Sequence, residues 1–331
     1  MSRLTHVTSG PYAPPPAARE LTVVSADGAR LHAEVHGPEG APAVVLAHGW
    51  TCSTAFWAAQ IRALATDHRV IAYDQRGHGR SPAVAQLPYT VDMLADDLEA
   101  VLAATLAPGE KAVLAGHSMG GMTIMAAAAR PGVREHAAAV LLCSTGASRL
   151  VAESTVVPIP PSGLRTRLTK AILGSKAPLG PVTPVGKKVL KYATMGPGSS
   201  PDKVEVCARI VHACPRGVRA GWSHVLSTLQ VDAGVEALTV PTAVLVGTHD
   251  RMTPAVHARR IAAALPRSEG LTELAGLGHM TPVEAPEAVT ARIRELGERY
   301  LKPEQSEKPE KNVQSQQSQQ NVQSEEGAQA A

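Results

Sequence analysis

Between residues 20 and 301, the chain alternates short apolar runs with segments in which apolar residues recur at helical spacing. This alternation constrains the fold most, because it is typical of a mostly parallel sheet that helices cover on both faces. The sequence therefore predicts an α/β fold. The predicted strands are 20–25, 30–35, 43–47, 69–73, 111–115, 138–143, 242–246 and 270–274.

Helical patterns lie between most of these strands. The first two strands are separated only by residues 26–29, which include Ala26, Asp27 and Gly28. Since these residues suit a turn, we expect the two strands to pair as a hairpin. The predicted helices are 54–65, 91–105, 119–129, 254–265 and 286–300.

One internal region breaks the alternation. Residues 148–233 are rich in proline and glycine, carry several helical patterns and have no strand rhythm. We predict that this insertion forms a helical cap over the carboxyl edge of the sheet, where open α/β sheets place their sites. The core of the fold is then formed by residues 20–147 and 234–301.

The two ends of the chain differ from this pattern. Residues 1–19 have low apolar content and contain Pro14, Pro15 and Pro16, which predicts a flexible leader. Residues 302–331 are rich in glutamine, serine, glutamate and lysine, and repeat the tetrapeptide Asn-Val-Gln-Ser. Such a segment buries too little apolar surface to offset its chain entropy, so we predict a disordered tail.

Composition excludes several functions. A formal net charge of +3 is too small to attract nucleic acid, and only 3% of the residues are aromatic, so few stacking platforms for bases exist. The four cysteines lack the close pairs of a zinc site, so we expect reduced thiols and no metal. Neither a signal peptide nor a transmembrane run is evident, which predicts a cytoplasmic protein. The oligomeric state cannot be derived from these features.

A candidate nucleophile follows the predicted strand 111–115. Ser118 is the centre of Gly116-His117-Ser118-Met119-Gly120, and a helical pattern begins directly after it. A strand, a sharp turn and a helix are the context of a nucleophile elbow, in which flanking glycines let the strand and the helix approach closely. We therefore predict that Ser118 is a catalytic nucleophile.

A serine hydroxyl needs a base, and the base needs an orienting acid. His279 follows strand 270–274 and Asp250 follows strand 242–246, so both lie at the carboxyl edge that also carries Ser118. Their order, serine, acid, histidine, is that of a hydrolase triad. Asp232 and Glu284 are rival acids, and a helix N-cap is the alternative role for Asp250.

Two backbone amides are candidates for an oxyanion hole. The strand 43–47 ends in His48-Gly49-Trp50, and a loop at this position can offer one N–H to a developing oxyanion. The residue after the nucleophile offers the second. We therefore predict that the N–H groups of Trp50 and Met119 form the hole.

These motifs together resemble those of α/β-hydrolase-fold enzymes, in particular the esterase, haloperoxidase-like and lactonase-like members. The resemblance covers about residues 21–301 and implies an eight-stranded sheet with a cap after the sixth strand. Haloalkane dehalogenases and epoxide hydrolases carry aspartate where this chain has Ser118, so the resemblance disfavours alkyl-enzyme chemistry. The matching segments are 48–50, 74–81, 116–121, 247–250 and 278–279.

The predicted function is that of a serine hydrolase that cleaves a carboxylic ester, or a related acyl bond, of a small hydrophobic substrate through an acyl-enzyme. No cofactor or metal is expected. Lactone hydrolysis, C–C bond hydrolysis and perhydrolysis use the same triad and stay open, as does a ligand-binding protein without turnover.

Four residues are candidates for substrate contact: His48, Gly49, Trp57 and Met122. Core packing is the alternative for Trp57 and Met122. Basic residues outnumber acidic ones in the insertion, and Leu164, Leu168 and Ile172 share one helical face there. This basic amphipathic pattern predicts either a solvated cap or weak contact with anionic substrates or surfaces.

Overall fold

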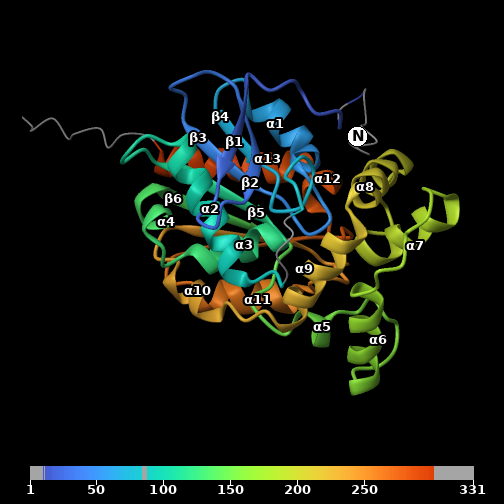
Figure 1. The fold of residues 1–331 in the computed structure, drawn as a ribbon. Helices are drawn as coiled ribbons and strands as arrows, with labels where there is room; N and C mark the ends of the chain where they lie inside the picture. The colour runs from blue at the N-terminus through green and yellow to red at the C-terminus, as the bar shows by residue number, and fades with distance from the viewer. Residues whose placement is uncertain (1–9, 11, 84–87, 302–331) are drawn as a thin grey trace, which may run out of the picture. The chain divides into compact units, whose positions relative to one another are not determined.

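The computed structural model describes residue 10 and residues 12–83 and 88–301. One eight-stranded sheet runs through it, in the order β1-β2-β4-β3-β5-β6-β7-β8 (Figure 1). All eight predicted strands are present. Their bounds are β1 Arg19–Val24, β2 Arg30–His36, β3 Ala43–Ala47, β4 Arg69–Tyr73, β5 Ala112–His117, β6 Ala137–Cys143, β7 Thr242–Gly247 and β8 Ser268–Leu274.

The sheet is parallel except at β2, which pairs antiparallel with both β1 and β4. The predicted hairpin between β1 and β2 is confirmed. Its turn is closed by the Gly28 N–H, which donates to the Ser25 carbonyl at 2.9 Å. Gly28 has a φ of 84°, a left-handed conformation that glycine adopts without strain.

The central strands are apolar throughout because both of their faces are buried. In β3, Val44 and Leu46 join the apolar cluster on one side of the sheet, while Val45 and Ala47 join the cluster on the other side. This alternation follows from the two-residue repeat of a strand. A sheet covered on both faces places its functional groups at the ends of its strands.

Helices cover the two faces. Apolar residues of α1 and α13 belong to one cluster, and those of α2, α3, α10 and α11 belong to the other. The predicted helix at 54–65 is split into a 3-10 turn at Thr54–Trp57 and α1, whereas the other four predicted helices match within two residues. The core helices are α1 Ala58–Leu64, α2 Val91–Thr105, α3 Met119–Ala127, α4 Pro131–His136, α10 Asp232–Ala237, α11 Ala255–Ala264, α12 Thr281–Glu284 and α13 Pro286–Tyr300.

The insertion, residues 148–233, is helical and connects β6 to β7. Its helices extend to one side of the sheet, in green to yellow in Figure 1. The boundary predicted between residues 233 and 234 falls inside α10, which starts at Asp232. The other helices of the insertion are α5 Leu150–Glu153, α6 Gly163–Leu173, α7 Pro184–Thr194, α8 Pro201–Ala213 and α9 Arg216–Thr228.

The terminal predictions fall largely outside the described residues. This holds for the whole predicted tail, 302–331, and for residues 1–9 and 11 of the predicted leader. In the described part of the leader, Ala13 is buried and its carbonyl accepts a hydrogen bond from Arg62 at 2.7 Å. No helix among the described residues has the length and apolarity needed to cross a bilayer.

Candidate active site

Ser118 lies in the sharp turn between β5 and α3. Its φ of 52° and ψ of −116° are a strained backbone conformation for a residue with a side chain. The turn is possible because two neighbours lack side chains. A Cβ on Gly116 would lie 2.6 Å from the backbone of Gly120, and a Cβ on Gly120 would lie 2.0 Å from the Ala47 carbonyl oxygen. The strand and the helix therefore approach as a nucleophile elbow requires.

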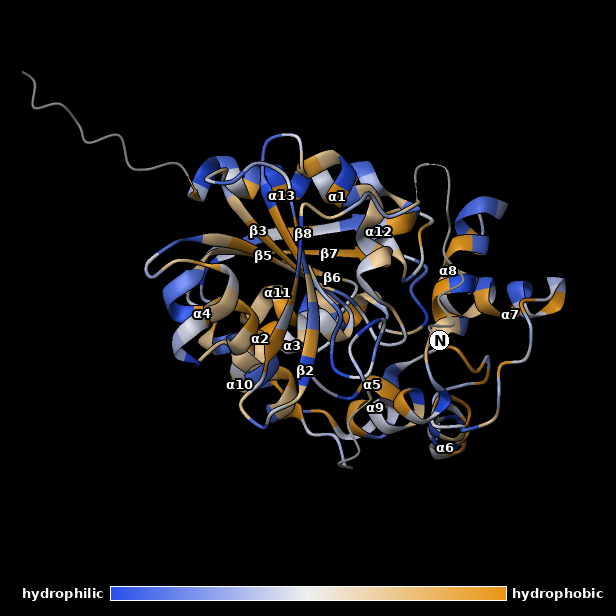
Figure 2. Cartoon of the chain, turned by 45° about the horizontal axis from the view of Figure 1, so that its top comes forward, coloured by the Kyte–Doolittle hydropathy of each residue, from blue (hydrophilic) through white to orange (hydrophobic). Residues whose placement is uncertain are grey.

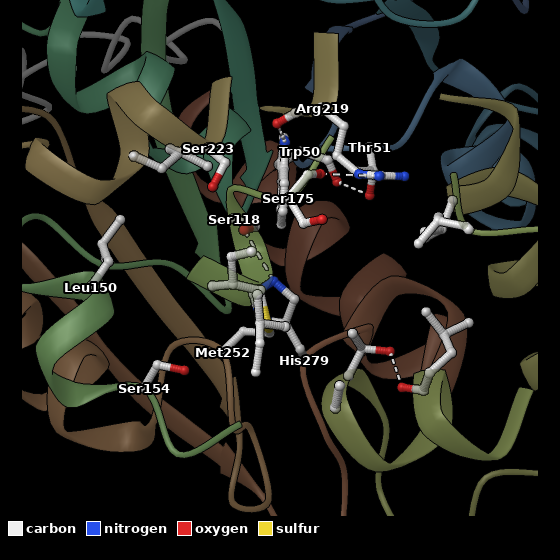
Figure 3. A pocket seen from close by; sticks show the side chains of 18 of the residues that line it. Trp50, Thr51, Ser118, Leu150, Ser154, Ser175, Arg219, Ser223, Met252 and His279 are labelled. Atoms are coloured by element: carbon white, nitrogen blue, oxygen red, sulfur yellow. Dashed lines mark hydrogen bonds between the residues drawn. The ribbon is translucent and has the colours of Figure 1, made fainter. Parts of the chain in front are cut away.

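The imidazole of His279 contacts the Ser118 hydroxyl. Nε2 of His279 lies 3.0 Å from Oγ of Ser118, within hydrogen-bond reach (Figure 3). His279 follows β8 in a loop that is itself held in place, because its N–H donates to the Thr194 carbonyl at 2.8 Å. The geometry lets the ring accept the hydroxyl proton.

Asp250 contacts the other side of the same ring. Its Oδ2 lies 2.8 Å from Nδ1 of His279, and its Oδ1 accepts hydrogen bonds from the N–H groups of Met252 and Thr253, both at 2.8 Å. The Thr253 hydroxyl adds a fourth contact, to Oδ2 at 2.9 Å. The carboxylate is thus buried, fully hydrogen-bonded and aligned with the imidazole.

The two rival acids lie elsewhere. Asp232 accepts a hydrogen bond from the Ser148 hydroxyl at 2.9 Å, at the start of α10. Glu284 is buried beneath the His279 loop, where its carboxylate accepts the N–H groups of Gly278 and Met280 at 3.1 Å. It therefore binds the backbone on both sides of His279, and not the ring.

Glu284 also contacts the insertion. Its Oε2 accepts hydrogen bonds from the Gly196 N–H and the Ser199 hydroxyl, both at 2.7 Å. One buried carboxylate thus joins the histidine loop to the segment between α7 and α8. The sequence pattern pointed to Glu284 only as a rival acid, because nothing local reveals which backbone groups meet there.

His117 also supports the histidine loop. Its Nε2 donates to the carbonyl of His279 at 2.8 Å, and within the described residues its buried Nδ1 has no partner. Burial, together with the nearby His279 ring, lowers the pKa of His117 well below its usual range. The ring is therefore neutral at physiological pH and holds its proton on Nε2.

The predicted oxyanion residues adjoin Ser118. Met119 is the first residue of α3, so its N–H has no partner within that helix. The other loop approaches closely, since a Cβ on Gly49 would lie 3.2 Å from the Cβ of Ser118. Within the described part of the chain the Trp50 N–H meets no acceptor, and the next residue, Thr51, has a φ of 64°.

The comparison with known proteins identifies the family. The model of the alpha/beta hydrolase family matches residues 44–292, which is most of the chain. The chain belongs to the alpha/beta hydrolase family. This confirms the fold class and the resemblance on which the sequence interpretation rested.

Individual relatives of this hydrolase differ in chemistry. A bifunctional esterase/perhydrolase of Acinetobacter calcoaceticus is 28% identical over 81% of this chain and 95% of its own length. RutD of Variovorax paradoxus (strain S110), named for carbamate hydrolysis, is 48% identical, but the match spans 28% of this chain and only 34% of that protein. A thermophilic esterase structure from Thermogutta terrifontis has 25% identity and a TM-score of 0.68, over 85% of this chain and 99% of that one.

In this hydrolase, a cavity of about 570 Å³ opens above Ser118 and His279. Its lining includes Met122, a candidate for substrate contact, and Trp50, a candidate for the oxyanion hole. Figure 3 shows Trp50 at this cavity. Most of the remaining lining comes from the insertion and is apolar, a contribution that sequence reasoning did not assign to particular residues. The insertion's apolar lining residues include Leu150, Val151, Ile172, Leu173, Val189, Leu190 and Leu226.

The other three substrate-contact candidates do not line this cavity. Trp57 is fully buried and packs edge-to-face against Phe56, with ring centroids 5.9 Å apart. His48 is also fully buried: Nδ1 donates to the Gly49 carbonyl at 2.8 Å and Nε2 accepts the Gln75 N–H at 2.9 Å. Both ring nitrogens of His48 are thus used by the backbone. Gly49 contributes by its lack of a side chain, which leaves room for His117 and Ser118.

Proposed function

We propose that this protein is a serine hydrolase that cleaves carboxylic esters with apolar acyl groups through an acyl-enzyme intermediate. The observation that carries the proposal is the series of hydrogen bonds from Ser118 through His279 to Asp250, at the floor of an apolar cavity. The family membership and the esterase relatives support the same reaction class.

In the first half of the reaction, Ser118 attacks the ester carbonyl. His279 accepts the hydroxyl proton at Nε2 as the new C–O bond forms, and the carboxylate of Asp250 stabilises the imidazolium. The N–H groups of Trp50 and Met119 donate to the oxyanion. His279 then gives its proton to the departing alcohol as the ester C–O bond breaks, which leaves the acyl group on Ser118.

The second half repeats these roles with water. His279 accepts a proton from water as the oxygen attacks the acyl carbonyl, and returns it to Oγ of Ser118 when the carboxylic acid leaves. Asp250 does not change its protonation state. Its four hydrogen bonds keep the carboxylate oriented in both halves.

The cavity lining favours an uncharged, apolar acyl group. Among the described residues that line the cavity, Arg219 is the only arginine, and none is a lysine, aspartate or glutamate. One nitrogen of the Arg219 guanidinium, Nη2, donates to the carbonyls of Ser175 and Ala177. A carboxylate on the substrate would therefore lose its hydration in a mostly apolar cavity, with one partly used cation as its only charged partner among the described lining residues. Burying each methylene of an acyl chain instead contributes about 0.8 kcal/mol.

Covalent labelling tests the proposal. A fluorescent organophosphonate should label the full-length protein, and Ser118→Ala should abolish labelling while its thermal unfolding stays unchanged. Ser223→Ala is the matched control, since Ser223 lines the same cavity and has no contact with His279. Labelling that persists in Ser118→Ala, or is lost in Ser223→Ala, would contradict the assignment.

Perhydrolysis is a second candidate, favoured by the likeness to the esterase/perhydrolase over 81% of this chain. In that reaction hydrogen peroxide replaces water: His279 accepts its proton, the peroxide oxygen attacks the acyl carbon, and a peracid leaves. Oxidation of a halide indicator with an ester and hydrogen peroxide present measures the peracid. Its formation by wild-type protein but not by Ser118→Ala is the expected result for this activity.

A further inference from the structure

The charge of the insertion is concentrated in one stretch. Residues 154–201 contain seven lysines and arginines and no aspartate or glutamate, although the whole chain has a net charge of only +3. Four of these cations, Arg167, Lys170, Lys176 and Lys188, are exposed and have no ion-pair partner among the described residues. This stretch of α6, α7 and their connection therefore presents uncompensated positive charge.

The same two helices turn apolar side chains outward. On α6, Leu164 and Ile172 are 61% and 57% exposed, and Leu168 between them is also exposed, whereas Arg165 and Thr169 are buried. The residues at 164, 168 and 172 are spaced by four, so they form one stripe along the helix. The helix thus exposes its apolar stripe, with Arg167 and Lys170 exposed beside it.

A second stripe lies on α7. Val185, Val189 and Tyr192 are exposed and spaced by four and three residues. Figure 2 shows hydrophobic and hydrophilic residues side by side along this helix. Exposed apolar residues that lie together in stripes, as opposed to singly, often mark an interaction surface.

Both stripes reach the mouth of the cavity. Ile172, Leu179 and Val189 are exposed, and each of them also lines the cavity above Ser118. Apolar surface therefore continues from the outside of the insertion into the site, with lysines and arginines beside it.

We propose that α6, α7 and their connection form a docking surface for an anionic lipid bilayer, with the cavity mouth against the membrane. Exposed leucines and valines would enter the interface while Arg167, Lys170, Lys176 and Lys188 meet the headgroups. An anionic soluble substrate explains the charge less well, because none of these four cations lines the described cavity. The docking surface does not depend on turnover, so its test is independent of the proposed function.

Co-sedimentation of the full chain with vesicles tests the docking surface. Binding is expected to vesicles of equimolar phosphatidylcholine and phosphatidylglycerol, but not to phosphatidylcholine alone, and it should weaken as salt rises from about 0.05 M to about 0.5 M. The triple variant Arg167→Gln, Lys170→Gln, Lys188→Gln should lower the partition coefficient on the order of 100-fold, at roughly fivefold for each cation.

Two further variants separate the contributions. Arg19→Gln, Arg30→Gln, Arg134→Gln removes the same charge from exposed positions of β1, β2 and α4, and should change binding less than about threefold. Leu164→Ser, Leu168→Ser, Val185→Ser removes apolar surface that does not line the cavity, and should lower binding at least about tenfold.

Equal binding to both kinds of vesicle, or equal losses in the two charge variants, would overturn the proposal. So would an apolar variant that binds like wild type. A different result is that no protein binds vesicles, while the triple variant of Arg167, Lys170 and Lys188 has a raised KM for a soluble anionic ester. In that case the charge would serve substrate capture, and the membrane-docking surface would be rejected.

Discussion

The floor of the site, formed by Ser118, His279, Asp250 and Glu284, differs from the outer helices of the insertion in how its polar groups are partnered. At the floor, buried polar groups bind one another: Asp250 accepts four hydrogen bonds, and Glu284 holds the backbone on both sides of His279. In α6 and α7, leucines, valines and lysines face outward. Hydrogen bonds within the chain hold the side chains of the floor in place. The exposed side chains of the outer helices have no such partners among the described residues and are free to contact another surface.

This difference separates what sets the reaction from what sets access to it. Hydrogen bonds hold the groups at the floor at fixed distances, as a proton transfer requires. Apolar and charged surface on α6 and α7 confers no such geometry, but it selects where the cavity mouth is placed. Changes at the floor should therefore alter kcat, and changes in the insertion should alter KM or binding.

The largest expected effect is at the floor. Asp250→Asn should lower kcat on the order of 10⁴-fold, because an amide no longer stabilises the imidazolium and can hold the wrong tautomer. Asp232→Asn is the matched control, since that carboxylate contacts Ser148 and not the triad, and should stay within about threefold of wild type. Steady-state kinetics on a p-nitrophenyl ester measures both. If Asp232→Asn lost more kcat than Asp250→Asn, Asp232 and not Asp250 would be the acid that orients His279.

The second-largest expected effect is a loss of folding stability in acid. Burial lowers the pKa of His48 to about 3 and that of His78 to about 4, and it also lowers the pKa of His117 well below its usual range. Below pH 6.5 these three histidines bind protons in the unfolded chain but not in the folded one. Their contribution to the free energy of unfolding is therefore present above pH 6.5 and is lost as pH falls toward the pKa values of the folded state. In that range each of the three rings lowers the free energy of unfolding by about 1.4 kcal/mol per pH unit.

Two buried carboxyls, Asp74 and Asp97, oppose this trend, because burial raises the pKa of each. Burial raises the pKa of Asp74 to about 6, so its folded form takes up a proton in the same range and offsets a little under 1 kcal/mol. The free energy of unfolding should therefore fall on the order of 3 kcal/mol from pH 7.5 to pH 5.5. Urea titrations at constant ionic strength measure it. A stability that is flat or rises across this range would show that the three rings are not buried and neutral.

The sequence predicted the sheet and the meeting of the triad because both follow from local patterns with a fixed geometric consequence. Continuous apolar runs such as 43–47 and 242–246 become buried strands. Residues that directly follow parallel strands lie at one edge, so Ser118, Asp250 and His279 come together although 161 residues separate the serine from the histidine.

Residues whose role depends on tertiary contacts could not be predicted in this way. His48 follows a strand just as Asp250 does, yet both of its nitrogens bind backbone. Glu284 is distant in sequence from Gly196 and Ser199, and no local pattern joins them. The amphipathic pattern of α6 was visible, but a pattern does not state which side faces outward, and here the apolar side does.

Removing one oxygen of Glu284 should have an intermediate effect. In Glu284→Gln an amide group would face N–H donors on both sides of His279, so the loop should shift and kcat should fall roughly 10- to 100-fold. KM for a short ester should change little, since Glu284 does not line the cavity. A purely structural role predicts a lower melting temperature with unchanged kcat, so both are measured, at a temperature well below the transition. An unchanged kcat would remove Glu284 as a positioning residue.

The smallest effect is expected in the insertion, at the junction of α9 with the cavity wall. Arg219 binds the carbonyls of Ser175 and Ala177, both of which line the cavity, and its own carbonyl accepts the Trp50 indole N–H at 3.0 Å. Both bonds come from Nη2, at the tip of the guanidinium. Because the lysine side chain is shorter by one bond, its ammonium should keep only one of the two.

Loss of one such hydrogen bond is worth about 1 kcal/mol, so Arg219→Lys should raise KM roughly fivefold for an octanoyl ester. An acetyl ester should be unaffected, because its acyl group does not extend to the 175–177 wall. Arg216→Lys, an exposed position on the same helix, is the control and should behave as wild type. The ratio of the two KM values is the informative measurement, since damage to the triad would lower kcat for both esters equally. An equal loss of kcat for both esters would show that Arg219 affects the reaction itself. The division between groups that set the reaction and groups that set access would then not hold for α9.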